Sequence, residues 1–475
     1  MEAVVGDILV LPFFGQGHLF PCIEICKRLS SYNYKLILII SPHLSSSIPS
    51  SLHQTHSLVE VLKIPASYSP LPPPPPELGA PPPPSPEEGS APEPGNGQGP
   101  RLNHLRHQEL GNGIESFITD RYKNPSQTRP LCVVIDVMMS WSKELFKKMQ
   151  IPIVSFFTSG ACSAAVEYAA WKSHVDDMKP DETRLLAGLP ESLALSYSDL
   201  KRRARPPSRF PKSGRRGPGG PPSGMNFGPP GPGQPPRWLE EADSSTALLI
   251  NTCDDLELPF LEYISSQIGK AVLGVGPMLS ENYWKSIGEV GQTLEEYAEL
   301  AAALGELNQS FIWVIQSGSG RQGPPPGFFG GKPGSDNDEG YYPHGLKEKV
   351  GDRGLIIKGW APQLLILSHP STHTGWNSTV EAIGLGVPIL AWPIRGDQFY
   401  DAKLVVNHLK VGHMVSTGGD SAEMVKKDDI MQQIEKLMGG EEVHNKAIGL
   451  RHIFGNGYPS TSMASLKAFL DLITQ

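Results

Sequence analysis

No part of the sequence reaches the roughly 18 consecutive apolar residues that a membrane-spanning helix requires. The N-terminus also lacks the basic start of a secretion signal, because Glu2 and Asp7 lie before and within its first apolar stretch. We therefore expect a chain with no integral membrane segment and no export signal.

Cysteine is scarce, with five residues among 475, an odd number that includes no CxxC pair. Secreted domains that depend on disulfides carry even numbers of cysteines at closer spacing. The pattern excludes a disulfide scaffold, favours free thiols in a reducing compartment, and predicts a cytoplasmic protein.

Basic charge is also in short supply. Lys and Arg total 41 against 49 Asp and Glu, which gives a formal net charge of −8. This balance provides no general attraction to nucleic acid or to anionic lipid, so we expect no nucleic-acid partner. Only the segment 201–216 is strongly basic, and we interpret it as a solvated loop, with an acidic partner as the alternative.

Proline and glycine are plentiful, but the proline excess is local. Fifteen of the 47 prolines lie between Pro65 and Pro100, and eleven lie between Pro206 and Pro236. Polyproline lacks backbone donors and buries little surface, so it favours extended loops. We expect two proline-rich loops, at about 65–105 and 204–237, inserted in a folded body; docking of an SH3-like partner is the alternative.

Short β-branched runs alternate with helix-length segments through the first half of the chain. This alternation predicts repeated βαβ units, and hence an open, doubly wound α/β sheet. The expected strands are 8–14, 35–40, 58–64, 131–137, 151–157 and 247–251. A second series is expected at 311–315, 355–357, 387–392 and 412–415.

The two series predict two α/β domains in tandem. We expect an N-terminal domain at 1–270, a C-terminal domain at 271–458, and a final helix at 459–475 that packs back on the first domain. Ligands of such sheets bind at the carboxyl ends of the strands, so two facing sheets would form a cleft.

Two polar residues stand at ends of strands expected in the first sheet. His18 follows the first strand in Gly15-Gln-Gly-His18, and Asp136 ends the strand at 131–137. Singly, each has an ordinary explanation as a capping or solvent-facing residue. Together they predict an imidazole oriented by a buried carboxylate, which is a general base. No Ser or Cys nucleophile motif competes, and the lack of GxGxxG spacing disfavours an NAD-binding oxidoreductase.

The densest group of distinctive residues lies in the second half. It consists of Trp360-Ala-Pro-Gln363, Ile366-Leu-Ser-His369, Gly375-Trp-Asn-Ser378, Glu381, Gly386-Val-Pro388, Trp392-Pro393 and Asp397-Gln398. This composite motif resembles the signature box of the plant family 1 UDP-dependent glycosyltransferases. Gly15-Gln-Gly-His18 with Pro21, Phe157-Thr158, Asn251-Thr252 with Leu256-Glu257, and Val275-Gly-Pro277 fit the same family in its order.

The resemblance implies the GT-B fold, in which two Rossmann-like parallel-sheet domains face each other across a cleft. It also implies that the N-terminal domain (1–270) binds the acceptor and that the C-terminal domain (271–458) binds the UDP-sugar donor. It implies an inverting transferase that moves a hexose, most often glucose, from a UDP-sugar donor to a hydroxyl of a small hydrophobic plant metabolite. The UDP-sugar would be a co-substrate, with no cofactor and no metal. His18 would be the catalytic base and Asp136 would stabilise its imidazolium.

The resemblance also implies a set of donor-binding residues. Uracil would contact Trp360 and Ala361, ribose would contact Gln363 and Glu381, the diphosphate would contact His373, Asn377 and Ser378, and the hexose would contact Trp376, Asp397 and Gln398; Thr158 completes the set. From the residues alone, Trp360 as a core aromatic and Glu381 as an ordinary helix residue remain open.

The sequence departs from the family at two places. About five residues of a glycine-rich strand are missing before His373, and a hydrophobic strand is missing before Thr293. Lost central strands leave neighbouring backbone groups unpaired, so the second domain is expected to be less stable. The alternative function is therefore a catalytically impaired or inactive truncated relative.

Overall fold

The computed structural model describes residues 4–64, 99–204, 233–279, 294–315, 341–358, 376–393, 396–415, 425–454 and 457–474. The greater part of both expected proline-rich loops, the basic segment beyond residue 204 and the two expected gaps before Thr293 and His373 lie outside these ranges.

The first half of the chain is built on a parallel sheet of seven strands in the order β3-β2-β1-β4-β5-β8-β9. Every neighbouring pair in it is parallel. The strands are β1 (Gly6–Leu11), β2 (Tyr34–Ile40), β3 (Val59–Lys63), β4 (Cys132–Asp136), β5 (Ile153–Phe157), β8 (Ala247–Ile250) and β9 (Ala271–Gly274). The predicted α/β class is confirmed, and among the described strands of this sheet only β9 was not expected from the sequence.

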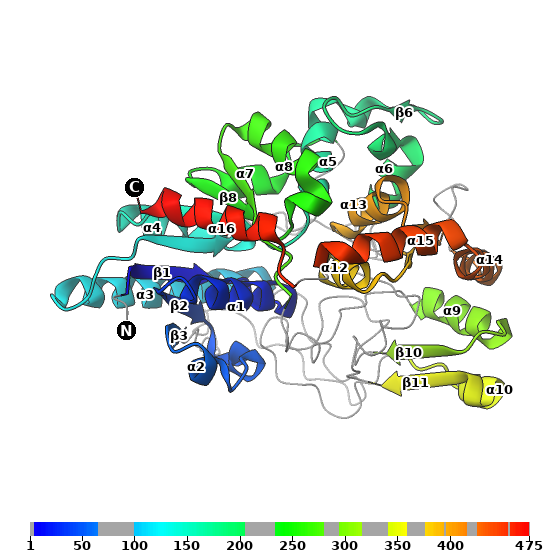
Figure 1. Cartoon of the computed structure of the whole chain (residues 1–475), viewed down its shortest axis with the longest axis horizontal. Coiled ribbons are helices and arrows are strands. Elements are labelled where there is room, and N and C mark those ends of the chain that lie inside the picture. The colour runs from blue at the N-terminus through cyan, green and yellow to red at the C-terminus, as the bar shows by residue number, and fades with distance from the viewer. Residues whose placement is uncertain are drawn as a thin grey trace, which may run out of the picture.

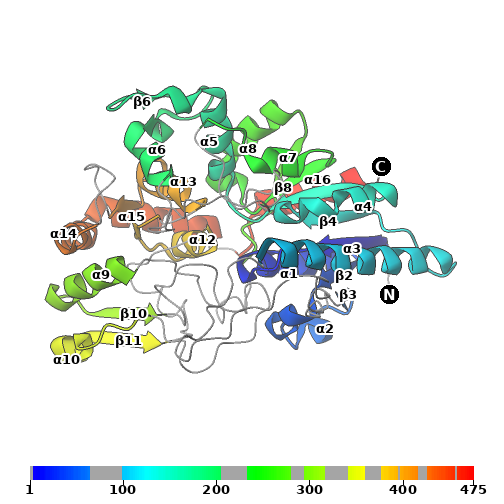
Figure 2. The same cartoon turned by 180° about the vertical axis from the view of Figure 1, so that it is seen from behind.

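Helices cover both faces of this sheet (Figures 1 and 2). In β1, Ile8 and Val10 face a core shared with α1, whereas Leu9 and Leu11 face a second core shared with α3. This alternation follows from the two-residue period of a strand. The helices of this half are α1 (Gln16–Ser30), α2 (Leu52–Thr55), α3 (Gly99–Lys123), α4 (Lys143–Lys148), α5 (Ala161–Lys172), α6 (Tyr197–Ala204), α7 (Arg237–Ala242) and α8 (Asp254–Ile268).

Short elements complete this half. Two residues each form the antiparallel strands β6 (Thr183–Arg184) and β7 (Leu195–Ser196). The 3-10 turns are η1 (Pro42–Ser47), η2 (Val137–Ser142), η3 (Val175–Asp177) and η4 (Glu191–Leu193).

The first loop expected from proline content ends earlier than predicted. Helix α3 begins at Gly99, so residues 99–105 are helical rather than part of the loop. Pro100 does not prevent this, because the first turn of a helix tolerates a residue without an N–H group.

The last helix, α16 (Ser460–Ile473), lies against strand β9 of the first sheet and against helix α8 (Figure 1). Its buried residues Leu466, Phe469 and Leu470 belong to the core that α1 shares with β1. The hydroxyl of Ser462 also donates to the carbonyl oxygen of Gly276.

The second half contains two separate pairs of parallel strands within the described residues. Strand β10 (Phe311–Ile315) pairs with β11 (Gly354–Lys358), and β12 (Ile389–Ala391) pairs with β13 (Gly412–Met414). The other elements are α9 (Leu294–Glu306), α10 (Leu346–Val350), η6 (Gly351–Arg353), α12 (Trp376–Leu385), α13 (Gln398–Lys403), the π-helical η7 (Leu404–His408), α14 (Lys427–Met438), α15 (Glu441–Leu450) and η8 (Arg451–Phe454).

One hydrophobic core crosses between the two halves. It joins buried residues of α5 and α8, such as Ala165 and Phe260, to buried residues of α12, α13 and η7, such as Val380, Tyr400 and Leu404. By contrast, α9, β10 and α10 share a small core of their own around Tyr297. The half that carries the donor motif is therefore partly continuous with the first half.

Candidate active site

Asp136 is the last residue of β4, and its side chain is fully buried. Its Oδ1 accepts a hydrogen bond from the Met138 backbone N–H at 3.0 Å, so it caps the turn that follows. Its Oδ2 lies 2.7 Å from Nδ1 of His18. The two explanations left open by the sequence, a cap and a partner of His18, therefore both apply, one to each oxygen.

His18 lies in the first turn of α1, with 27% of its side chain exposed. A buried carboxylate next to Nδ1 favours the tautomer with hydrogen on that nitrogen, which leaves the lone pair on Nε2. The hydroxyl oxygen of Thr158 lies 2.9 Å from the same Nδ1, and the Phe13 ring meets the imidazole edge to face. The arrangement can accept a proton at Nε2 and hold the positive charge beside Asp136.

A proline in α1 opens a contact with the second half of the chain. Pro21 has no N–H, so it cannot donate to the carbonyl of Gly17 four residues earlier. That carbonyl accepts a hydrogen bond from Nδ2 of Asn377 at 3.2 Å. The first residues of α12 are thereby held next to His18.

Asn251 strengthens this contact from the end of β8, where it is fully buried. Its Nδ2 donates to the carbonyl of Thr158 at 3.1 Å and to Oδ1 of Asn377 at 3.2 Å. Its Oδ1 accepts from the backbone N–H of Met278 at 2.7 Å. One amide side chain thus connects the end of β5, the start of α12 and the link that follows β9.

Trp376 opens α12 and is only 3% exposed. Its indole Nε1 donates to the carbonyl of Asn251 at 2.8 Å. A Cβ on Gly160 would lie 2.6 Å from the indole ring, so glycine is needed there for the ring to fit. The indole is therefore enclosed by the first half of the chain. The hexose contact predicted for Trp376 stays a prediction, and it would have to involve the backbone of this residue.

Two further residues of α12 that are predicted to bind the UDP-sugar donor are buried. Ser378 is 8% exposed and Glu381 is 2% exposed. Together with Asn377 they lie in the first turns of a ten-residue helix, whose N-terminal N–H groups attract anions. The predicted donor residues Trp360, Ala361, Gln363 and His373 lie outside the described residues.

Asp397 and Gln398 lie at the start of α13. The carboxylate of Asp397 makes no side-chain capping bond to its own helix, although aspartate at this position commonly does. Instead its Oδ2 accepts a hydrogen bond from the hydroxyl of Ser159, which follows β5 in the first half.

The start of α5, just beyond Ser159, is held by a buried acid. Glu257 accepts hydrogen bonds from the backbone N–H groups of Ala161 and Cys162, both at 2.8 Å. Burial raises the pKa of Glu257 to about 7, although the two hydrogen bonds by themselves lower it. The carboxylate therefore fixes the helix start that follows the Thr158–Ser159 segment.

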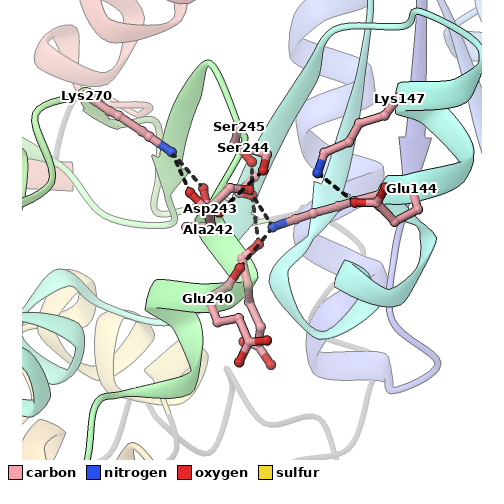
Figure 3. A network of polar contacts seen from close by, with 11 residues as sticks. Glu144, Lys147, Glu240, Ala242, Asp243, Ser244, Ser245 and Lys270 are labelled. Atoms are coloured by element: carbon pink, nitrogen blue, oxygen red, sulfur yellow. Dashed lines mark hydrogen bonds and ion pairs between the residues drawn. The ribbon is translucent and has the colours of Figure 1, made fainter.

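Two lysines donate hydrogen bonds to the end of α7, and one of them, Lys143, lies in the segment after Asp136. Figure 3 labels the other, Lys270, with Glu240, Ala242 and Asp243 of the helix end. Lys143 donates to the carbonyls of Glu240 at 3.3 Å and Asp243 at 2.8 Å, and Lys270 donates to the carbonyl of Ala242 at 3.2 Å. Cations at a helix C-terminus satisfy its last carbonyls and its dipole. Burial lowers the pKa of Lys143 to about 8.

Ser159, Asn251 and Glu257 had no role predicted from the sequence, although Asn251 and Glu257 belong to one of the segments that resemble the family. A signal for two of them was present. Ser159 and Asn251 follow the ends of expected strands, where His18 and Asp136 were sought for the same reason. Their partners in the other half could not be inferred from spacing.

Within the described ranges, no group of three or more His, Cys, Asp or Glu residues is arranged to hold a metal ion. In the same ranges, no helix combines the length and the apolar character needed to cross a membrane.

Known proteins resemble this chain in sequence and in structure. Residues 248–455 match the family described as UDP-glucoronosyl and UDP-glucosyl transferase. UDP-glucosyl transferase 73M2 of Saponaria officinalis is 29% identical over 67% of this chain and 68% of its own length.

Solved structures of plant enzymes resemble the whole chain. UGT73P12 of Glycyrrhiza uralensis, complexed with glycyrrhetinic acid 3-O-monoglucuronide, has a TM-score of 0.70 at 21% identity, covering 99% of this chain and 96% of that one. A transferase of Siraitia grosvenorii in complex with UDP has a TM-score of 0.67 at 20% identity, covering 99% and 100%. The fold is accordingly GT-B. Residues 248–455 match the UDP-glucoronosyl and UDP-glucosyl transferase family, and the sequence relatives are plant UDP-glycosyltransferases.

Proposed function

We propose that this protein is an inverting glycosyltransferase that moves a hexose, with glucose preferred, from a UDP-sugar to a hydroxyl of a small hydrophobic metabolite. The observation that carries the proposal is the 2.7 Å contact between His18 Nδ1 and the buried carboxylate of Asp136. The contact lies beside the N-terminus of α12, to which Gly17 is hydrogen bonded.

In this reaction His18 acts as the general base. Its Nε2 takes the proton of the acceptor hydroxyl while the oxygen attacks the anomeric carbon of the sugar. The bond between that carbon and the UDP oxygen breaks on the opposite side, so the anomeric configuration inverts. Asp136 stabilises the imidazolium and keeps the ring oriented through its contact with Nδ1. The hydroxyl of Thr158 lies within hydrogen-bond distance of the same nitrogen.

The second half of the chain supplies the donor site. Asn377, Ser378 and His373 bind the diphosphate at the α12 N-terminus, where backbone N–H groups stabilise the charge that develops on departing UDP. Trp360 and Ala361 bind uracil, and Gln363 and Glu381 bind ribose. Asp397, Gln398 and the backbone of Trp376 bind the hexose.

The proposed chemistry needs only the two co-substrates, with no cofactor and no metal. We place the reaction in the cytoplasm, a location supported by the five cysteines, all of which are buried free thiols. We also propose domains with limits near those expected, at 1–270, 271–458 and 459–475, except that β9 (Ala271–Gly274) pairs with β8 and so belongs to the first domain. The contacts of α16 with β9 support the last of these limits.

The test is turnover of UDP-glucose by the purified full chain with a panel of phenolic and terpenoid alcohols. Release of UDP in equal amount to glycoside formed supports the proposal. If no acceptor is glycosylated at protein concentrations that bind UDP-glucose, the protein is a nucleotide-sugar binder without transferase activity.

A further inference from the structure

Two consecutive hydroxyl residues connect the two parts of the proposed site. Thr158 and Ser159 follow β5 directly and precede α5. The Thr158 hydroxyl lies 2.9 Å from the imidazole of His18, whereas the Ser159 hydroxyl donates to the carboxylate of Asp397. The same turn therefore contacts the base in the first half and a hexose-binding candidate in the second.

This turn is held on each side by buried groups. Asn251 donates to the carbonyl of Thr158 at 3.1 Å, and Glu257 accepts from the N–H groups of Ala161 and Cys162. The indole of Trp376 packs against Gly160 so closely that no side chain fits there. Because these contacts fix its backbone, the turn can serve as a rigid platform for Ser159.

Asp397 depends on this platform for its orientation. It occupies the N-cap position of α13 but makes no capping bond with its side chain. The hydroxyl of Ser159 instead engages Oδ2. A carboxylate held through one oxygen presents the other in a defined direction, and a hydrogen bond to a charged group is among the stronger ones in proteins.

We propose that Ser159 is a positioning residue that orients Asp397 toward the donor hexose, so that recognition of the sugar requires contact between the two halves of the chain. This inference rests on the proposed function. It implies a separation of effects: loss of the Ser159 hydroxyl weakens binding of the sugar and leaves binding of the UDP moiety intact, because Asp397 is assigned to the hexose alone.

The experiment compares UDP and UDP-glucose binding by calorimetry, without acceptor, in the full-length wild type and variants. We expect Ser159→Ala to bind UDP-glucose about tenfold more weakly. Its affinity for UDP should stay within about twofold of wild type, which is the ordinary range for a change that touches no ligand contact. Ser159→Thr, which keeps the hydroxyl, should restore most of the lost affinity.

Ser163→Ala is the matched control. Ser163 lies in the same helix start, is buried, and donates only to the carbonyl of Gly160 among the bonds described for it. It should leave the ratio of UDP-glucose to UDP affinity unchanged. In a double-mutant cycle, Ser159→Ala added to Asp397→Ala should cause no further loss, because the two residues act through one contact.

Three results would overturn the inference. They are an unchanged UDP-glucose affinity in Ser159→Ala, an equal loss of UDP and UDP-glucose affinity, and full additivity in the cycle. If the wild type binds UDP and transfers sugar while one of these holds, only the role of Ser159 fails. If the wild type binds neither ligand, the proposed function fails and this inference fails with it.

Discussion

The chemistry proposed for His18 depends on the groups around its Nδ1. From this nitrogen, the buried Oδ2 of Asp136 lies at 2.7 Å and the hydroxyl oxygen of Thr158 at 2.9 Å. The His18 side chain is 27% exposed. The contacts of Nδ1 therefore orient the ring and leave this nitrogen unsuited to accept a proton from a substrate. The opposite nitrogen is the one suited to proton transfer.

Replacement of the base should separate catalysis from donor binding. We expect His18→Ala to lower kcat by about 10²- to 10⁴-fold, the usual contribution of a general base. UDP affinity measured by calorimetry should be unchanged. His53→Ala, at an exposed position in α2, is the control and should retain full activity. A parallel loss of UDP binding in His18→Ala would argue that His18 has a structural role instead.

Glu257 predicts a pH dependence of stability. Burial raises its pKa to about 7 in the folded protein, above the value of about 4.5 for an exposed glutamate. Between these values the folded state keeps a proton that the unfolded state has lost. The free energy of unfolding should therefore fall as pH rises from about 4.5 to 7, by on the order of 3 kcal/mol from this group.

The measurement is urea unfolding of wild type and Glu257→Gln across this pH range. The variant cannot ionise at this position, so its stability should fall less steeply with pH. Glu262→Gln, on the exposed side of the same helix, should keep the wild-type slope. Identical slopes for wild type and Glu257→Gln would show that Glu257 ionises normally.

At the scale of elements, the end of α7 illustrates how a short helix is stabilised. Its last carbonyls accept from Lys143 and from Lys270, and Figure 3 labels Lys270 beside Ala242 and Asp243. Lys143 is 6% exposed. Since Lys143 begins the helix that follows η2, the contact also fixes the segment immediately after Asp136.

Loss of this contact should destabilise the protein. We expect Lys143→Met to reduce the free energy of unfolding by about 1–3 kcal/mol, because it removes the hydrogen bonds that a buried ammonium group donates to the carbonyls of Glu240 and Asp243. Lys147→Met removes an ion pair with Glu144 whose side chains are 40% and 82% exposed, and it should change stability little. Thermal unfolding of the two variants provides the comparison, and equal melting temperatures would contradict the anchoring role.

Most strands were predictable from the sequence because buried parallel strands are continuous β-branched runs. Their ends were less predictable. The first strand was expected to reach residue 14, but Pro12 cannot donate to the ladder and β1 ends at Leu11. The strand at 131–137 ends one residue early because Asp136 caps the turn that begins at Val137. β9 was missed because four residues ending in glycine give a weak signal.

At the scale of the whole molecule, the sequence predicted the α/β class and the pair formed by His18 and Asp136, but not the common core. Sequence periodicity reports which residues are buried within an element, and it says nothing of which distant element covers them. The core that joins α5 and α8 to α12, α13 and η7 depends on such partners. For the same reason the contacts of Ser159 with Asp397 and of Asn251 with Asn377 were not foreseen.

The shared core predicts how the chain unfolds. Helices α5, α8 and α12 should exchange their amide hydrogens together, through the global opening, because they share one set of buried contacts. The unit of α9, β10, α10 and β11 should open first, because its core contains only five buried side chains among the residues that the structure describes. Native-state hydrogen exchange measures this directly. If α12 exchanges with β10 rather than with α5, the whole second half unfolds separately.

The most direct test of the central claim is the anomeric configuration of the product. Purified protein should be incubated with UDP-α-glucose and an acceptor alcohol from the panel, and the product examined by NMR. A β-glucoside from the wild type, and its loss in His18→Ala with UDP binding retained, is the result expected for a single displacement assisted by His18 and Asp136. An α-glucoside, or a His18→Ala variant that remains active, would contradict the account.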